Sequence, residues 1–467
     1  MKKRIALCLA ALAVLAAVGW FAYHAIGQRV RTQQRVALPG EARDMMRVNA
    51  SVEEDLRRVA GTQTLAITNR TDQDLTELVL RLYPNAVSED GLVLSGVTVD
   101  GQEISFSYDA QDKSVLRVPL EWASGRTIHV SWRFALVIPR GEGWFYRSDA
   151  QALCVGALAV PALWQDGAWR CDEWDVLAGP LGTSRFDYEL TLDAPESVLA
   201  AFGGALVGCE RQAGRMIWTA QGEGALEMPF ALRLRSAAAL RQKEMAGVLV
   251  SALGDNAAQA NRLLAQTEKA LSSLEKTGLP YEGRALCVVQ GQTGFVDGLI
   301  GSGLIAVDEE ADAEQLLRRL TRLIARQRFG IAARNDPWRT PWLSQTLASA
   351  AELLAFRART GESAYEERYF GEIEIATRLT RPRGVTIGAS VDRFGGDAEM
   401  TQVLRDQGAA MLLGIEQAVG EEAFVQALAR YGELAGDAPG DQELLEKALL
   451  EATLSNWSGY LADELAW

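Results

Sequence analysis

The spacing of apolar residues along this chain changes near residue 240, and this change limits the folds that the chain can adopt. Before residue 240, apolar and polar residues alternate in short runs, as from Ile128 to Phe134 and from Phe186 to Leu192. A period of two predicts strands with one buried face. After residue 240, apolar residues recur every three or four positions, which predicts helices. We therefore expect an α+β multidomain protein, with a β-domain at residues 48–238 and a mainly helical domain at residues 239–467.

Turn signals sharpen this division. Val97 and Val99 lead into Asp100-Gly101, and the next alternating run starts at Ile104, which is typical of a β-hairpin and predicts an antiparallel domain. In the second domain, Asp255 is the expected N-cap of a helix that ends near Lys276. A short strand at 286–289 and a Gly-rich, apolar edge strand within 295–307 should follow. Five further helices are then predicted, at residues 313–329, 341–359, 399–417, 421–434 and 441–453.

The N-terminus is an apolar segment of the length that spans a bilayer. Lys2, Lys3 and Arg4 precede the run from Ile5 to Ile26, which is 22 residues long, and a membrane-spanning helix needs about 20 residues. We expect a single-pass transmembrane anchor at residues 1–27, a polar tether at 28–47, and a body on the extracytoplasmic side of the cell membrane. The alternative is a cleaved signal peptide, so whether this helix is retained stays open.

The net charge restricts the possible binding partners, and the cysteine content restricts the possible disulfides. The net charge is −14, and because six positive charges lie before Glu41, the remaining residues carry −20. Such an acidic body repels nucleic acid, so no nucleic-acid partner is expected. An exported body with four cysteines permits disulfides in three possible pairings, and four free thiols are the alternative. These cysteines are Cys154, Cys171, Cys209 and Cys287.

Histidine is scarce, which excludes several kinds of active site. The chain has only His24, within the predicted anchor, and His129, on a predicted strand. One histidine in the body cannot build a two-histidine zinc site, and a serine–histidine–aspartate triad would have one candidate base. No phosphate-binding loop, no G-x-G-x-x-G after a strand and no C-x-x-C is present. We therefore expect no cofactor. Paired carboxylates for a hydrolase remain possible, because acidic residues are abundant.

Several segments resemble the membrane alanyl aminopeptidase family of zinc metallopeptidases, the gluzincins, over about residues 50 to 460. The family's zinc helix, H-E-x-x-H followed by Gln-Trp-Phe-Gly, is similar to residues 321–330 (TRLIARQRFG), and its Trp-Leu-x-Glu helix to residues 342–348 (WLSQTLA). The resemblance implies a saddle-shaped β-domain followed by a thermolysin-like domain. The other segments that carry it are Leu279-Pro280-Tyr281, 295–307, 335–338 (NDPW), 407–409 (QGA), 420–424 (GEEAF) and 186–195 (FDYELTLDAP).

The sequence departs from this family where the chemistry would be performed. The two zinc-ligand histidines correspond to Arg322 and Arg326, whose guanidinium groups have no lone pair to give. The general base corresponds to Leu323, and the third ligand, a Glu in the family, corresponds to Gln345. The resemblance therefore implies a degenerate member with neither catalytic nor metal-binding residues.

Two further positions depend on the same alignment, and one charged partner is expected. The Glu that binds a substrate's amino group in the family falls near Ile300, and the Tyr that supports the oxyanion falls near Arg405. Glu352 lies two helical turns after Gln345 on the same face. We expect it to neutralise the arginines from within, because unpaired buried charge is costly. Binding of an anionic ligand by the arginines is the alternative.

These observations predict a membrane-anchored, catalytically inactive aminopeptidase-like protein that acts as a binding or scaffolding module at the outer side of the cell membrane. A protein or peptide partner in the cleft would suit this function. The alternatives are a hydrolase that reuses the cleft with other residues, and a residual metallopeptidase.

Overall fold

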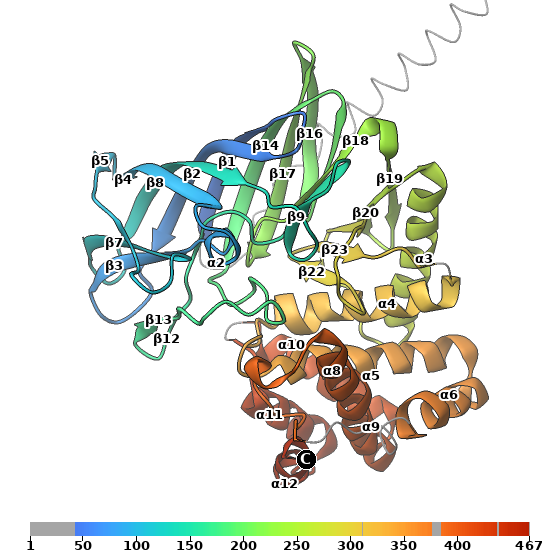
Figure 1. Cartoon of the computed structure of the whole chain (residues 1–467). Helices are drawn as coiled ribbons and strands as arrows, with labels where there is room; N and C mark the ends of the chain where they lie inside the picture. Colours follow the sequence, from blue (N-terminus) through green and yellow to red (C-terminus); the bar gives the residue numbers. More distant parts are fainter. Residues whose placement is uncertain (1–42, 311, 376–383, 437–438, 467) are drawn as a thin grey trace, which may run out of the picture.

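The computed structural model describes residues 43–310, 312–375, 384–436 and 439–466 of the chain (Figure 1). The predicted transmembrane anchor and most of the predicted tether lie outside these residues. Within them, no helix combines the length and the hydropathy that crossing a bilayer requires.

An eight-stranded sheet forms the base of the β-domain, and its strands alternate as the sequence predicts. In β8, Ile128, Val130, Trp132 and Phe134 are all buried. Asp100 and Gly101 have φ of 50° and 81° and join Val99 to Gln102, so the predicted hairpin is confirmed. In spatial order the strands are β16 (Ala205–Gln212), β17 (Arg215–Ala225), β14 (Phe186–Pro195), β1 (Asp44–Val52), β2 (Arg58–Thr68), β8 (Thr127–Val137), β4 (Leu92–Val99) and β5 (Gln102–Glu103).

The prediction of a purely antiparallel domain was wrong in one place. β1 pairs with β14 in parallel, with Asp44 opposite Phe186 and Ser51 opposite Asp193. A parallel pair needs a long crossover, and here the whole of β2 to β13 lies between the two strands. Alternation shows which face of a strand is buried but not the direction of its neighbour, so the sequence pattern carried no sign of this pairing.

Smaller sheets complete the β-domain. They contain β15 (Val198–Phe202), β18 (Phe230–Leu234), β10 (Gln151–Cys154) and β9 (Phe145–Arg147); β11 (Val160–Pro161), β3 (Leu75–Arg81), β7 (Val115–Trp122) and β6 (Ser107–Tyr108); and β12 (Trp164–Gln165) with β13 (Ala168–Trp169). A short helix, α2 (Pro84–Val87), follows β3. Of the two alternatives expected from the sequence, disulfides and free thiols, the structure has free thiols at all four cysteines of the body. Cys154 and Cys287 are fully buried.

The second domain begins with a five-stranded sheet. Its order is β19 (Ala239–Met245), β20 (Val248–Gly254), β21 (Ala285–Gln290), β23 (Leu304–Val307) and β22 (Leu299–Gly301), so β22 lies at one edge and pairs antiparallel with β23. The predicted edge strand within 295–307 is therefore present as this β22–β23 hairpin. Helix α3 (Ala257–Lys276) is capped by Asn256, not by Asp255. The Asp255 carboxylate instead binds Arg233 and Gln290, which a helical periodicity cannot reveal.

Helices fill the rest of the second domain, close to the predicted positions. α4 (Ala313–Arg326) lies between the five-stranded sheet and α5 (Pro341–Thr360), as Figure 1 shows. The predicted helix at 313–329 changes to a π-helix, η2 (Gln327–Ala332), at its end. The remaining helices are α6 (Glu362–Arg368), η3 (Tyr369–Glu374), α8 (Asp397–Thr401), η5 (Gln402–Gln407), α9 (Gly408–Val419), α10 (Glu421–Leu434), α11 (Gln442–Thr453) and α12 (Ser458–Leu465), with short 3₁₀ turns η1 (Arg235–Ala237) and η4 (Val391–Arg393).

The two domains share one continuous apolar core, and polar contacts also cross between them. Trp144 of the β-domain packs edge-on against Phe295, with ring centroids 5.9 Å apart. The Trp338 indole donates to the carbonyl of Glu173 at 3.1 Å. The body is therefore one packed unit in which the segment 293–303 lies at the joint.

Candidate functional site

The residues that the resemblance would place in a cleft come from α4, α5, the loop before β22 and the α8–η5 segment, and we refer to this site as the cleft. Asp312 caps α4 by accepting hydrogen bonds from the backbone N–H groups of Glu314 and Gln315 at 2.7 and 2.8 Å. Arg322 and Arg326 lie one turn apart near the opposite end of α4, where positive charge is favourable.

Arg322 is held by a carboxylate that the sequence did not single out. It is 7% exposed, and its Nε and Nη2 donate to Oδ2 and Oδ1 of Asp297 at 2.9 and 2.7 Å. Two parallel hydrogen bonds of this kind are the strongest arginine–carboxylate geometry. The remaining Nη1 lies 3.4 Å from Oε2 of Glu352, the partner expected from the sequence. Arg322 is thus neutralised from two sides.

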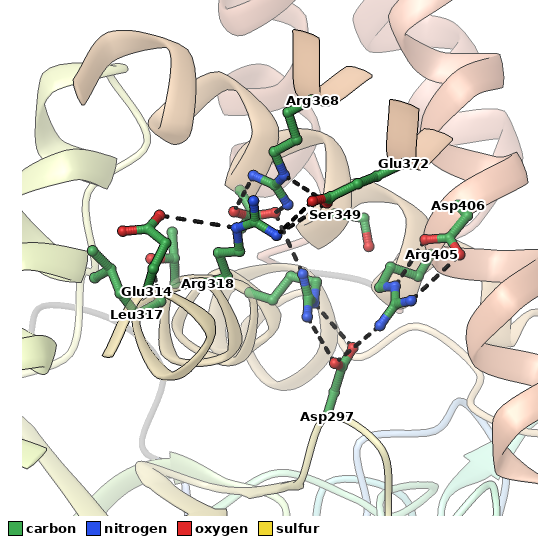
Figure 2. Close-up of polar contacts among 12 residues, drawn as sticks. Asp297, Glu314, Leu317, Arg318, Ser349, Arg368, Glu372, Arg405 and Asp406 are labelled. Carbon is green, nitrogen blue, oxygen red and sulfur yellow. Dashed lines mark hydrogen bonds and ion pairs between the residues drawn. The ribbon is translucent and has the colours of Figure 1, made fainter. Parts of the chain in front are cut away.

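Asp297 joins Arg322 to a second arginine, Arg405 of η5. Nη1 of Arg405 lies 3.3 Å from Oδ1 of Asp297, and its Nε donates to Asp406 at 2.8 Å. Burial by itself raises the pKa of Asp297, but the charges of Arg322 and Arg405 outweigh burial and lower that pKa to about 2. Figure 2 shows Asp297 reaching from its loop towards Arg405. Asp297 is therefore ionised throughout the physiological pH range.

The ion pairs continue through the domain beyond Glu352. Glu352 is 2% exposed and accepts two hydrogen bonds from Arg368, at 2.9 and 2.8 Å. Arg368 and Arg318 both contact Glu372, at 3.1 and 3.0 Å. Figure 2 shows Arg318, Arg368 and Glu372 close together. These connected ion pairs contain as many arginines as carboxylates, so their charges balance. Their members are Arg318, Arg322, Arg359, Arg368 and Arg405 with Asp297, Glu314, Glu352, Glu372 and Asp406. We refer to these ten residues as the ion-pair network.

Arg326 differs from its neighbour Arg322. It is half-buried, no carboxylate of the described residues lies within 4.0 Å of it, and its buried Nε has no hydrogen-bond partner there. Burial lowers the pKa of Arg326 to about 10, although Asp297 and Asp397 act in the opposite direction. The expectation that Glu352 would pair with both arginines therefore holds for Arg322 alone.

The other predicted positions are apolar wall or half-buried surface. Leu323 is 0% exposed and Ile300 1% exposed, and the tip of the Ile300 side chain lies near Gly330. Gln345 is half-buried in α5, and Arg405 is half-buried within the network. The structure thus brings Arg322, Arg405 and Glu352 together and leaves Leu323 and Ile300 in the core.

Asp297 is the residue that sequence reasoning missed. It stands between Val296 and Gly298 in the segment read as an apolar strand, and a lone acid there was the only available signal. Gly298 has φ of 102°, and a Cβ at this position would lie 2.4 Å from the carbonyl oxygen of Ala306. Glycine therefore allows the sharp bend that turns Asp297 towards α4.

The residues of this cleft do not fit a zinc ion. Zinc requires imidazole, thiolate or carboxylate donors at about 2 Å, whereas Arg322, Arg326 and Gln345 offer two guanidinium groups and an amide. The oxygens of Asp297 already accept from arginines. Across the described ranges, no three His, Cys, Asp or Glu side chains converge in a way that could hold a metal ion.

Comparison with solved structures identifies the fold. The M1 zinc metallopeptidase from Deinococcus radiodurans matches with a TM-score of 0.68 and 16% identity, over 92% of this chain and 95% of that one. A mutant of that enzyme bound to a Tyr-Ser-Ala substrate matches with a TM-score of 0.65 and 16% identity, over 91% and 93%. No protein-family model and no curated protein sequence matches the chain. At this identity the likeness establishes the fold, so the predicted α+β, peptidase-like architecture is confirmed.

Proposed function

We propose that this chain is a non-catalytic relative of the M1 metallopeptidases, anchored in the cell membrane, whose body binds a protein or peptide partner on its outer side. The fold supports descent from a peptidase scaffold. The observation that carries the proposal is the ion-pair network, in which Arg322 and Arg405 bind Asp297 where the family would place a metal.

The chemistry of these groups supports a binding function over hydrolysis. A guanidinium group cannot polarise a scissile carbonyl as a Lewis acid does, and Leu323 cannot accept a proton from water. Removing one partner from a buried ion pair is strongly destabilising, so the balanced network maintains the packing of α4 against α5 without a metal.

The location of the partner follows from the predicted anchor. Ile5 to Ile26 has the length of a membrane span, and the tether after it would hold the acidic body near the bilayer. Association with another envelope protein through the cleft or its rim suits a body that repels nucleic acid and anionic lipid.

The proposal is tested by measuring the bound zinc and the peptidase activity of the full chain in detergent. We expect well under one zinc per chain by elemental analysis, and no cleavage of a panel of aminoacyl substrates. The Deinococcus radiodurans metallopeptidase, prepared in parallel, serves as the positive control. Stoichiometric zinc with chelator-sensitive turnover would overturn the proposal, and turnover that a chelator leaves unchanged would favour a hydrolase with other residues.

Capture from detergent-solubilised membranes tests the binding function. The full chain should retain a defined partner that Asp297→Ala, which opens the cleft, retains less well. An equal yield from both proteins would place the interaction away from the cleft.

A further inference from the structure

Glu227 is a carboxylate buried at the joint between the two domains. It lies in the β-domain between β17 and β18 and is 0% exposed. Its Oε1 accepts from the backbone N–H of Ser302 at 2.6 Å, and its Oε2 from that of Gly156 at 3.3 Å. No ion pair among the described residues includes Glu227. A buried carboxylate without a cation is uncommon, because its charged form is poorly solvated.

The turn that Glu227 binds is clamped from both domains. Residues 301–303 connect β22 to β23, and Ser302 Oγ accepts from the N–H of Leu226 in the β-domain at 2.9 Å. From the other side, Gln327 of η2 accepts from the N–H of Gly303 at 3.0 Å and donates to the carbonyl of Gly301 at 2.9 Å. The position of this turn therefore depends on hydrogen bonds from two domains at once.

Glycine makes the fit at this turn tight. A Cβ on Gly301 would lie 2.8 Å from Oε1 of Glu227, and a Cβ on Gly303 would lie 2.0 Å from the carbonyl oxygen of Gly203. The backbone of the turn thus lies directly against the β-domain, with no room for a side chain at either glycine.

The same hairpin leads into the cleft. β22 contains the buried Ile300 and starts two residues after Asp297, which binds Arg322 and Arg405. A displacement of the 301–303 turn would therefore be transmitted along a three-residue strand to the carboxylate that fills the cleft.

Glu227 titrates in a range where its neighbours do not. Burial raises the pKa of Glu227 to about 7, against the lowering effect of the Ser302 and Gly156 N–H groups and of the Ser302 side chain. Burial also raises the pKa of Tyr188 in β14 and of Tyr281, and raises that of Cys287 in β21 to about 12. Gly156 and Gln327, which also border the turn, are not titratable, so among the described residues named here Glu227 is the one whose pKa lies near neutral.

We propose that Glu227 is a pH-sensitive latch that holds the 301–303 turn against the β-domain when it is neutral and loosens the turn when it is ionised. The latch rests on the proposed function, because its role would be to control how firmly Asp297 occupies the cleft. Because the pKa of Glu227 is raised in the docked state, its contribution is complete below the ordinary pKa of a Glu and is lost as pH rises through about 7.

Amide hydrogen exchange of the full chain tests the latch directly. If the loosened turn restores the ordinary pKa, the docked form should lose about tenfold in its equilibrium constant between pH 6 and pH 8. Protection factors of the amides of residues 299–305, corrected for intrinsic exchange, should fall by that factor in the parent chain. They should stay constant in Glu227→Gln, while Glu121→Gln, at an exposed position of the same domain, should behave like the parent.

A parent chain whose protection at 299–305 is the same at both pH values would overturn the latch, and this outcome does not depend on whether Glu227→Gln folds. A fall that persists unchanged in Glu227→Gln would also overturn it, by assigning the titration to another group. The measurement involves neither zinc nor a partner, so it can fail or succeed independently of the proposed function.

Discussion

A partly exposed carboxylate and a fully buried one, at the two ends of one short strand, show how differently this fold treats the same chemical group. Asp297, before β22, has a pKa of about 2, whereas Glu227, which contacts the turn after β22, has a pKa of about 7. Burial raises both pKa values. The difference is that two arginines face Asp297, whereas the backbone N–H groups of Ser302 and Gly156 and the Ser302 side chain face Glu227. Asp297 in the cleft is thus ionised and paired with arginines throughout the physiological pH range. Glu227 at the joint has no ion-pair partner among the described residues and changes its charge near neutral pH.

The strongest test of this comparison is the removal of Arg322. Because Arg322 is buried and has two carboxylate partners, Arg322→Ala should lower the free energy of unfolding by about 3–5 kcal/mol, the usual cost of breaking a buried pair. Urea denaturation measures this. Arg241→Ala, an exposed position, should change stability by less than about 0.5 kcal/mol. A loss below 1 kcal/mol for Arg322→Ala would show that the network does not stabilise the cleft.

Ionisation of Glu227 at the joint should lower the free energy of unfolding as pH rises. Asp297 in the cleft should have the opposite pH dependence. The pKa of Glu227 is raised to about 7 from 4.5, so the free energy of unfolding should fall by about 2–3 kcal/mol between pH 5 and pH 8 through this group. In Glu227→Gln that portion of the slope should disappear. Parallel pH profiles for the two proteins in thermal or urea unfolding would contradict the comparison.

The cleft should make stability fall as pH drops. The pKa of Asp297 is lowered from 3.8 to about 2, so it contributes stability above the ordinary pKa and loses it as pH falls through about 2. Asp297→Asn should be about 2 kcal/mol less stable at pH 7. This deficit should shrink between pH 4 and pH 2, whereas the exposed control Asp72→Asn should show no deficit at either pH. A deficit that is constant with pH would assign the effect to packing.

Arg326 should give the smallest effect, although it lies one turn from Arg322. It has no ion pair among the described residues, so Arg326→Ala should change the free energy of unfolding by less than about 1 kcal/mol. Thermal unfolding with and without phosphate tests whether Arg326 binds an anion, because bound phosphate would stabilise the parent and not the variant. A loss as large as that of Arg322→Ala would contradict the distinction between the two arginines.

Much of the fold could be predicted because it depends on local pattern. The alternation of β8, the Asp100-Gly101 hairpin and the helices around 341–359 and 421–434 were all readable from spacing and turn chemistry. The parallel pairing of β1 with β14 was not, since strand direction depends on which distant segment arrives beside it. The Asn256 cap was missed because Asp255 was recruited by Arg233 from the other domain.

The candidate site was predictable only in part, for the same reason. Glu352 follows Gln345 on one helical face, so its approach to Arg322 could be expected from helical geometry. Asp297 and Arg368 come from other segments of the chain, and nothing in their local sequence indicates that they meet at one place.

The sequence by itself determined which atoms are available: guanidinium groups at 322 and 326 and an amide at 345, where the resemblance would align zinc ligands, and one histidine in the body. That conclusion depends on residue type alone. Only the tertiary structure decided the charge states, because the pKa of a carboxylate depends on which cations and how much solvent the fold places around it. Asp297 and Glu227 therefore acquire opposite behaviour from their surroundings, and no pattern along the chain distinguishes them.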